Sequence, residues 1–138
     1  MSEAYTGGCA CGAIRYEISA EPVAMNHCQC RDCQRKSGTG HGSYLTFPDK
    51  RSVKREGEAK QWDIVADSGN VKTRAFCPTC GSPVYMMFSA MPDLFVVHAA
   101  SLDDPNRFKP QKVMYGVRGY AWDSIDPALP KFDKMPPR

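Results

Sequence analysis

The sequence predicts an all-β domain that contains at most one short helix. Short apolar runs of strand length recur along the 138 residues, and turn signals such as Ser37-Gly38 and Pro48-Asp49 separate them. The 11 glycines and 11 prolines exceed the usual combined share of about 12 %, which favours many short elements over long helices. A mass of 15.3 kDa fits one domain, which we expect to cover residues 1–138.

The first expected strand shows the alternation on which this prediction depends. Between positions 13 and 19, Ile14, Tyr16 and Ile18 alternate with polar residues, which is the period of a half-buried strand. Further strands are expected at residues 23–27, 41–47, 59–65, 71–76, 84–88, 94–100 and 112–117. One helical turn or two is expected at residues 32–37. The prolines of the last twelve residues predict an extended strap over the sheet.

Composition and charge exclude several classes of protein. No stretch approaches the roughly 20 apolar residues that cross a bilayer, and the first residues lack the apolar segment of a secretory signal. We therefore expect a soluble, cytoplasmic protein without a membrane partner. The formal charge is +3, and seven thiolates with two Zn²⁺ would bring it to zero. Nucleic-acid binding through bulk charge is thus not expected.

The seven cysteines indicate metal binding rather than disulfides. An odd number leaves one thiol over, and cysteines this close in sequence make strained disulfide partners, whereas thiolates on one cation need only converge. They occur in three groups: Cys9 and Cys11; Cys28, Cys30 and Cys33; Cys77 and Cys80.

The first and last groups together predict a closed zinc site. Cys77 and Cys80 form a Cys-x-x-Cys knuckle that Gly81 lets bend back, and strands on both sides argue against a redox pair. Cys9 and Cys11, two residues apart on an extended chain, face the same way. Four sulfurs would complete a structural site with no open position.

The middle group predicts a different site. Cys28, Cys30 and Cys33 offer three thiolates within six residues, which leaves the fourth corner of a tetrahedral ion open. An open position is what a catalytic zinc needs, because water or a substrate thiol can enter and lose its proton there. We therefore expect two Zn²⁺ per chain, one structural and one catalytic.

Residues around the middle group are candidates for substrate binding. Arg31, Arg35 and Lys36 could offset the negative charge of the site or bind the carboxylates of an acidic substrate, or could be ordinary solvated charges. His27 or His41 could instead close the site as a fourth ligand. The side chain of His27 should point away from that of the next residue, and His41 could line the pocket.

Five motifs follow one another along the chain: GGCACG from residue 7, HCQCRDCQRKSG from 27, DSGN from 67, RAFCPTCGSP from 74 and SLDDP from 101. In this order they resemble the glutathione-dependent formaldehyde-activating enzyme family, which also includes centromere protein V. The resemblance covers the chain from residue 7 to about residue 136.

The resemblance implies a β-tent fold, built from small antiparallel sheets around a structural zinc. It also implies a carbon–sulfur lyase that condenses formaldehyde with glutathione to S-hydroxymethylglutathione, and the reverse. By position, the structural ion would be held by Cys9, Cys11, Cys77 and Cys80, and the catalytic ion by Cys28, Cys30 and Cys33.

Two further hypotheses stay open at the level of sequence. The first is a zinc-stabilised binding module that docks a protein partner and catalyses nothing. The second is an enzyme resembling methionine sulfoxide reductase, which would need a free nucleophilic cysteine when all seven are already assigned to metal. For the leading hypothesis the partner is a small thiol such as glutathione, and a homodimer is left open.

Overall fold

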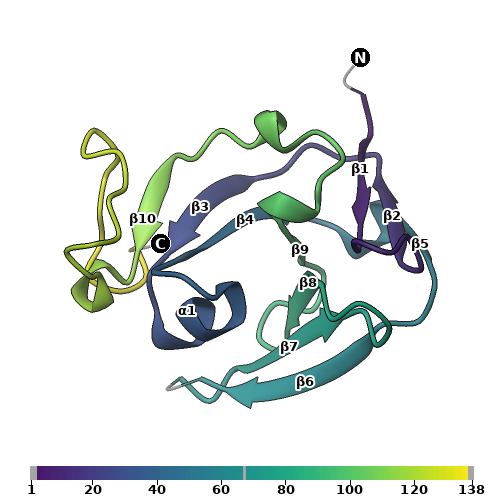
Figure 1. Ribbon diagram of the computed structural model, residues 1–138, viewed down its shortest axis with the longest axis horizontal. Coiled ribbons are helices and arrows are strands. Elements are labelled where there is room, and N and C mark those ends of the chain that lie inside the picture. Colours follow the sequence, from purple (N-terminus) through teal and green to yellow (C-terminus); the bar gives the residue numbers. More distant parts are fainter. Residues whose placement is uncertain (1–2, 67, 137–138) are drawn as a thin grey trace.

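Among the described residues, 3–66 and 68–136, the computed structural model contains ten strands, one α-helix and four 3-10 turns (Figure 1). The strands are β1 (Tyr5–Gly8), β2 (Arg15–Ile18), β3 (Ala24–Cys28), β4 (Gly42–Phe47), β5 (Val53–Glu56), β6 (Lys60–Val65), β7 (Val71–Phe76), β8 (Pro83–Phe88), β9 (Phe95–His98) and β10 (Lys112–Met114). The helix is α1 (Arg31–Ser37), and the 3-10 turns are Lys50–Ser52, Ala99–Ser101, Pro105–Arg107 and Gly116–Arg118. The predicted all-β class with one short helix is confirmed. Asp67 of the DSGN motif lies outside the described residues.

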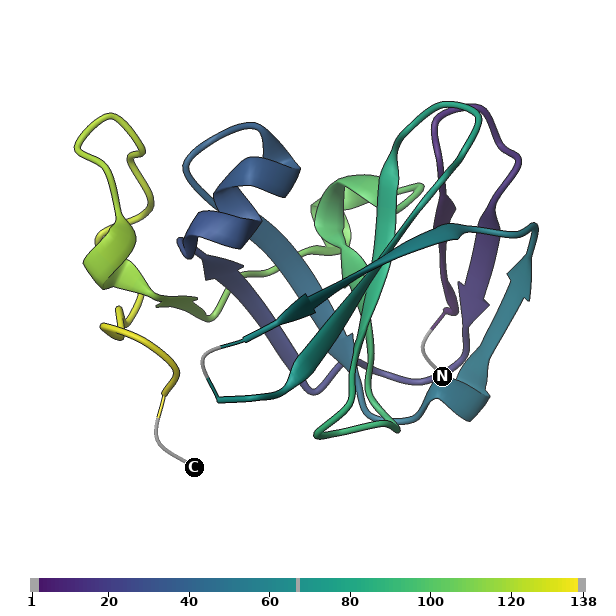
Figure 2. The same ribbon diagram turned by 90° about the horizontal axis from the view of Figure 1, so that it is seen from below.

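The strands form two sheets. One has the order β1-β2-β5 and the other β10-β3-β4-β9-β8-β7-β6. Every pair is antiparallel, as expected, except β10 with β3, which is parallel. Since β9 and β10 run in the same direction, the connection of residues 99–111 has to return along the sheet before β10 begins. Figure 2 shows the small sheet at one end of the molecule and the C-terminal segment at the other.

The main core lies where the two sheets face each other. Ile14, Tyr16 and Ile18, the alternating apolar residues of the first predicted strand, are buried there. They share one cluster with Leu45 and Phe47 of β4, which are fully buried. Each such side chain stabilises the fold by roughly 1.5–3 kcal/mol when it leaves water.

Two strands were not predicted, and one segment lies elsewhere than expected. The end of β1, Gly7 and Gly8, carries no apolar alternation, and β5 is mostly exposed because it is an edge strand beside β2. The C-terminal strap runs beside β10 at the sheet edge instead of over the sheet: the Val113 amide donates to the Pro130 carbonyl oxygen at 2.9 Å.

Within the described residues, no helix is long and apolar enough to cross a membrane.

Gly57, between β5 and β6, is a position where a side chain should be costly. It has a φ of 84°, and a Cβ atom there would overlap the carbonyl oxygen of Ala13. Gly69 has a nearly equal φ of 86° but open space around it. We expect Gly69→Ala to lower the free energy of unfolding by about 1 kcal/mol through backbone strain alone.

Gly57→Ala should lower the free energy of unfolding by at least about 2 kcal/mol, because a backbone clash adds to the same strain. Urea unfolding of the zinc-loaded protein measures both variants. Equal losses would mean that the contact with Ala13 does not constrain the loop.

Candidate functional site

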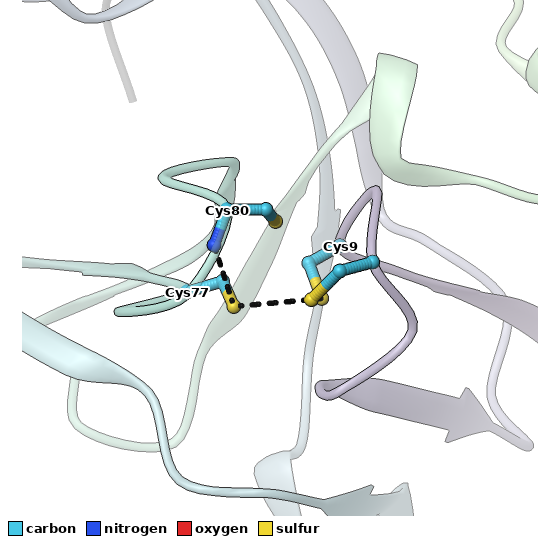
Figure 3. Close-up of side chains that lie close together, drawn as sticks. Cys9, Cys77 and Cys80 are labelled. Carbon is cyan, nitrogen blue, oxygen red and sulfur yellow. Dashed lines mark hydrogen bonds between the residues drawn. The ribbon is translucent and has the colours of Figure 1, made fainter.

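Four cysteine sulfurs converge from two loops far apart in sequence. Cys9 and Cys11 lie between β1 and β2, and Cys77 and Cys80 lie between β7 and β8. Figure 3 shows the side chains of Cys9, Cys77 and Cys80 close together. All four Sγ atoms lie within 4.8 Å of one another, and the separations are 3.6 Å for Cys9 to Cys11 and 3.7 Å for Cys11 to Cys77. Zinc–sulfur bonds of about 2.3 Å in a tetrahedron place the sulfurs about 3.8 Å apart, so this four-sulfur cluster fits Zn²⁺.

Backbone amides point at two sulfurs of the four-sulfur cluster. The Ile14 amide donates to Cys9 Sγ at 3.2 Å, and the amides of Thr79 and Cys80 lie 3.4 and 3.5 Å from Cys77 Sγ. Such donors favour the thiolate form that a metal binds. The two loops are also joined directly, because the Ala10 amide donates to Ser82 Oγ at 3.2 Å.

Three more sulfurs converge at the start of α1. Cys28 ends β3, Cys30 is the N-cap of α1, and Cys33 lies in its first turn. The Cys33 amide donates to Cys30 Sγ at 3.3 Å, so the cap itself holds two of the sulfurs together. The three Sγ atoms lie within 4.8 Å of one another, and only Cys30 is partly exposed. We call this the three-sulfur cluster.

No histidine or carboxylate donor of the described residues joins the three-sulfur cluster. His27 Nδ1 lies 2.8 Å from Ser43 Oγ, and His41 Nδ1 lies 2.8 Å from a carboxylate oxygen of Asp123. The two rings meet edge to face with centroids 4.8 Å apart. Burial and the neighbouring His41 lower the pKa of His27 to about 4. Neither histidine is placed as the fourth ligand that the sequence left open.

Like charge opposes the ionisation of all three thiols in the three-sulfur cluster. Hydrogen bonding to Cys30 and Cys33 raises the pKa of Cys28, and hydrogen bonding to Cys28 and Cys33 lowers that of Cys30 to about 2. Each further thiolate would be added against like charge in a mostly buried site, so a bound cation favours the fully ionised set.

A buried charge network covers the three-sulfur cluster. Arg74 Nη2 donates to Cys33 Sγ at 3.4 Å, and Arg74 Nε donates to Asp32 Oδ2 at 2.8 Å. Lys72 Nζ donates to the same carboxylate oxygen at 2.8 Å. The Arg74 side chain is only 5 % exposed. Two cations and one anion therefore lie beside the three thiols, and Tyr44, whose pKa burial raises, packs among them.

A cavity of about 680 Å³ opens beside the two clusters. Its walls include Ala10, Arg15, Lys36, His41, Ser43 and Asp103. Gly42, which also lines it, is the strand partner of Cys28. None of the three described sulfurs of the three-sulfur cluster lines the cavity itself. The cavity thus lies next to that cluster, because its wall includes Gly42 on β4, the residue paired with Cys28 on the neighbouring strand.

The four predicted substrate-binding residues separate into two sets. Lys36 and His41 line the cavity. Arg31 does not: its Nη1 donates to Gln34 Oε1 at 2.7 Å and to the Tyr120 hydroxyl at 2.8 Å. Arg35 is exposed and is not among the lining residues. The structure brings together only Lys36 and His41 of these four.

The sequence model of the glutathione-dependent formaldehyde-activating enzyme family matches residues 4–118. The chain belongs to this family. A protein of Halomonas elongata named "Putative glutathione-dependent formaldehyde-activating enzyme" is 25 % identical over 111 residues, 78 % of this chain and 71 % of that protein.

A solved structure shares the fold. The crystal structure of a Rhodobacter sphaeroides protein matches with a TM-score of 0.58 at 20 % identity, over 74 % of this chain and 93 % of that one. At this identity the likeness concerns the fold alone.

Three residues beside the three-sulfur cluster of this family member were not predicted from the sequence as part of the site: Asp32, Lys72 and Arg74. One signal was present: Lys72 and Arg74 sit two apart on a predicted strand, so they share a face. Their partner Asp32 lies between two cysteines of the middle group. Nothing in the sequence indicates that this strand and helix meet, because the paired residues are 40 and 42 positions apart.

Arg74 should stabilise both the fold and the three-sulfur cluster of this family member. Arg74→Met leaves Asp32 with one cation and removes the donor to Cys33 Sγ. We expect a loss of about 3 kcal/mol in the free energy of unfolding, since breaking a buried pair strands a charge. Zinc should also be lost to a chelator at lower chelator concentration.

Arg51→Met is the matched control. It breaks a pair with Asp49 in which the arginine side chain is 84 % exposed, so the loss should stay below about 1 kcal/mol. Urea unfolding and chelator titration measure both variants. Similar losses from the two changes would refute a special role for Arg74.

Proposed function

We propose that the protein is a zinc-dependent carbon–sulfur lyase resembling S-(hydroxymethyl)glutathione synthase, which joins the thiol of glutathione to formaldehyde or a related small aldehyde. The observation that carries the proposal is the difference between the two clusters, four sulfurs in one and three in the other. Since tetrahedral zinc binds four donors, only the three-sulfur cluster leaves a position for substrate. Family membership supports the choice of thiol and aldehyde.

The four-sulfur cluster would hold a structural zinc in a single domain of residues 1–138. Its ligands come from loops 66 positions apart, as Cys11 and Cys77 illustrate. A closed shell of four thiolates has no position for substrate, and it restrains the long chain segment between the two loops. Stabilisation of the fold is the role we assign to it.

Zinc bound by Cys28, Cys30 and Cys33 would supply Lewis acidity, which favours the thiolate form of a thiol that binds it. Three thiolates and one Zn²⁺ carry a net charge of −1, and a substrate thiolate makes it −2. Arg74 and Lys72 lie where they offset this charge. Lys36 would bind a carboxylate of the thiol substrate from the cavity wall.

The cellular setting follows from the same chemistry. All seven cysteines are unpaired in the structure, and thiols stay reduced where glutathione is abundant. We therefore propose action in the cytoplasm on a small thiol, without a nucleic-acid or membrane partner. A homodimer would be compatible with this activity.

Zinc-loaded protein mixed with glutathione and formaldehyde tests the proposal. We expect glutathione to bind at millimolar concentration or tighter by isothermal titration calorimetry. Exchange NMR should show faster interconversion of free glutathione and its hydroxymethyl adduct than the uncatalysed reaction. If glutathione neither binds nor reacts faster than in the uncatalysed reaction, glutathione is not the substrate. Four protein donors at both metal sites in an X-ray absorption spectrum would favour the non-catalytic binding module.

Replacing one ligand in each cluster separates their roles. Cys30→Ser should abolish the faster exchange and leave the melting temperature nearly unchanged, because Cys30 is partly exposed at a helix N-cap. Cys77→Ser should unfold the domain: Cys77 is fully buried in the main core, and a structural zinc contributes on the order of 10 kcal/mol. Thermal melts and zinc stoichiometry measure both. Equal damage would contradict the division of labour.

A further inference from the structure

A histidine–carboxylate pair lies at the wall of the cavity. His41 Nδ1 lies 2.8 and 2.9 Å from the two carboxylate oxygens of Asp123. The Asp123 side chain is 7 % exposed and that of His41 is 22 % exposed. Asp123 is therefore buried, and His41 reaches the cavity that it lines.

The carboxylate of Asp123 is fixed from three sides. Gln29, between two ligands of the three-sulfur cluster, donates from Nε2 to Asp123 Oδ2 at 3.1 Å. His41 occupies the second side. On the third lies Gly40, where a Cβ atom would overlap the carboxylate, so the backbone approaches closely only because the residue is glycine. The orientation of Asp123 is thus built into the fold.

The contact with Asp123 sets the tautomer of the neutral His41 imidazole. A carboxylate accepts hydrogen bonds, so Nδ1 of His41 has to donate, and in the neutral ring Nε2 then carries the lone pair. Among the described residues, none is hydrogen-bonded to Nε2 of His41. The charged and titratable neighbours are His27 on β3, Asp123 on the C-terminal segment and Lys36 at the end of α1, which lines the same cavity.

We propose that His41 is a catalytic proton-transfer residue for the reaction in the cavity and that Asp123 is its positioning residue. The inference rests on the proposed function. Adding a thiol to an aldehyde breaks the S–H bond and forms a C–S bond with the sulfur electron pair. The C=O π electrons move to oxygen. His41 Nε2 accepts the thiol proton and returns one to that oxygen, so the hydroxymethyl product forms without a net change in protons.

The hydrogen bond between His41 and Asp123 is not needed to attach the C-terminal segment. Gln34 Nε2 donates to the Arg118 carbonyl oxygen at 3.0 Å, and the Tyr120 hydroxyl donates to Gln34 Oε1 at 2.9 Å. These contacts hold the segment next to α1 without His41. Asp123 lies beyond residues 4–118, the part that the family model matches, so this chain supplies the carboxylate from outside that part.

Three variants of the zinc-loaded protein test the inference in the exchange assay. His41→Asn keeps an N–H donor near the Nδ1 position but removes the acceptor. We expect the turnover rate to fall by about a hundredfold, with the glutathione KM changed less than about threefold. Asp123→Asn should lower the rate by about tenfold or more, since its amide can donate to Nδ1 and stabilise the wrong tautomer. Asp133→Asn, an exposed position on the same segment, should leave the rate unchanged.

A second readout does not depend on activity. Nitrogen-15 NMR of the imidazole should show the Nδ1–H tautomer of His41 in the parent protein and its loss in Asp123→Asn, with melting temperatures within a few degrees. The Nε2–H tautomer in the parent, or a His41→Asn rate within about threefold of the parent rate, overturns the inference while the proposed function stands. A parent protein that does not accelerate exchange overturns both.

Discussion

The convergence of four cysteine sulfurs is the constraint on which the rest of the structure depends. The four-sulfur cluster joins the loop after β1, in the small sheet, to the loop after β7, in the large one. Cys9 and Cys77 belong to the same buried cluster as the apolar residues between the sheets. A metal held by the four sulfurs would therefore close the same interface as apolar burial. In a chain of 138 residues, where a single core is small, such a tie matters more than in a larger domain.

The three-sulfur cluster belongs to a second packing unit. Cys28 and Cys33 pack with Tyr44, Met86 and Val96 in a buried cluster separate from the main core. Its sulfurs also have polar neighbours: the Cys33 amide at the helix cap donates to Cys30, and the buried Arg74 donates to Cys33. This cluster is separate from the main core, so a change at the three-sulfur cluster need not disturb the packing between the sheets.

Features that depend on residues close together in the sequence were predicted, and features that depend on distant residues were not. Alternation of apolar and polar residues located β2, a short apolar run located β4, and the spacing of the cysteines predicted both clusters, because these signals lie close together in the sequence. β1 and β5 lacked a local signal: one ends in Gly7-Gly8 and the other is an exposed edge. Arg74 and Asp123 could not be assigned, since their partners are 42 and 82 positions away and become neighbours only through the sheet order.

The position of the cavity links these observations. Gly42 lines it and pairs with Cys28, and a Cβ atom at Gly42 would overlap the Tyr44 hydroxyl. Tyr44 packs in turn with Cys33. One strand, β4, thus contacts the three-sulfur cluster through Tyr44 and the cavity through Gly42 and Ser43. The cavity wall and the packing around the three-sulfur cluster therefore share one strand. Because β4 forms part of both, a shift of this strand would change the cavity wall and the packing around the three-sulfur cluster together.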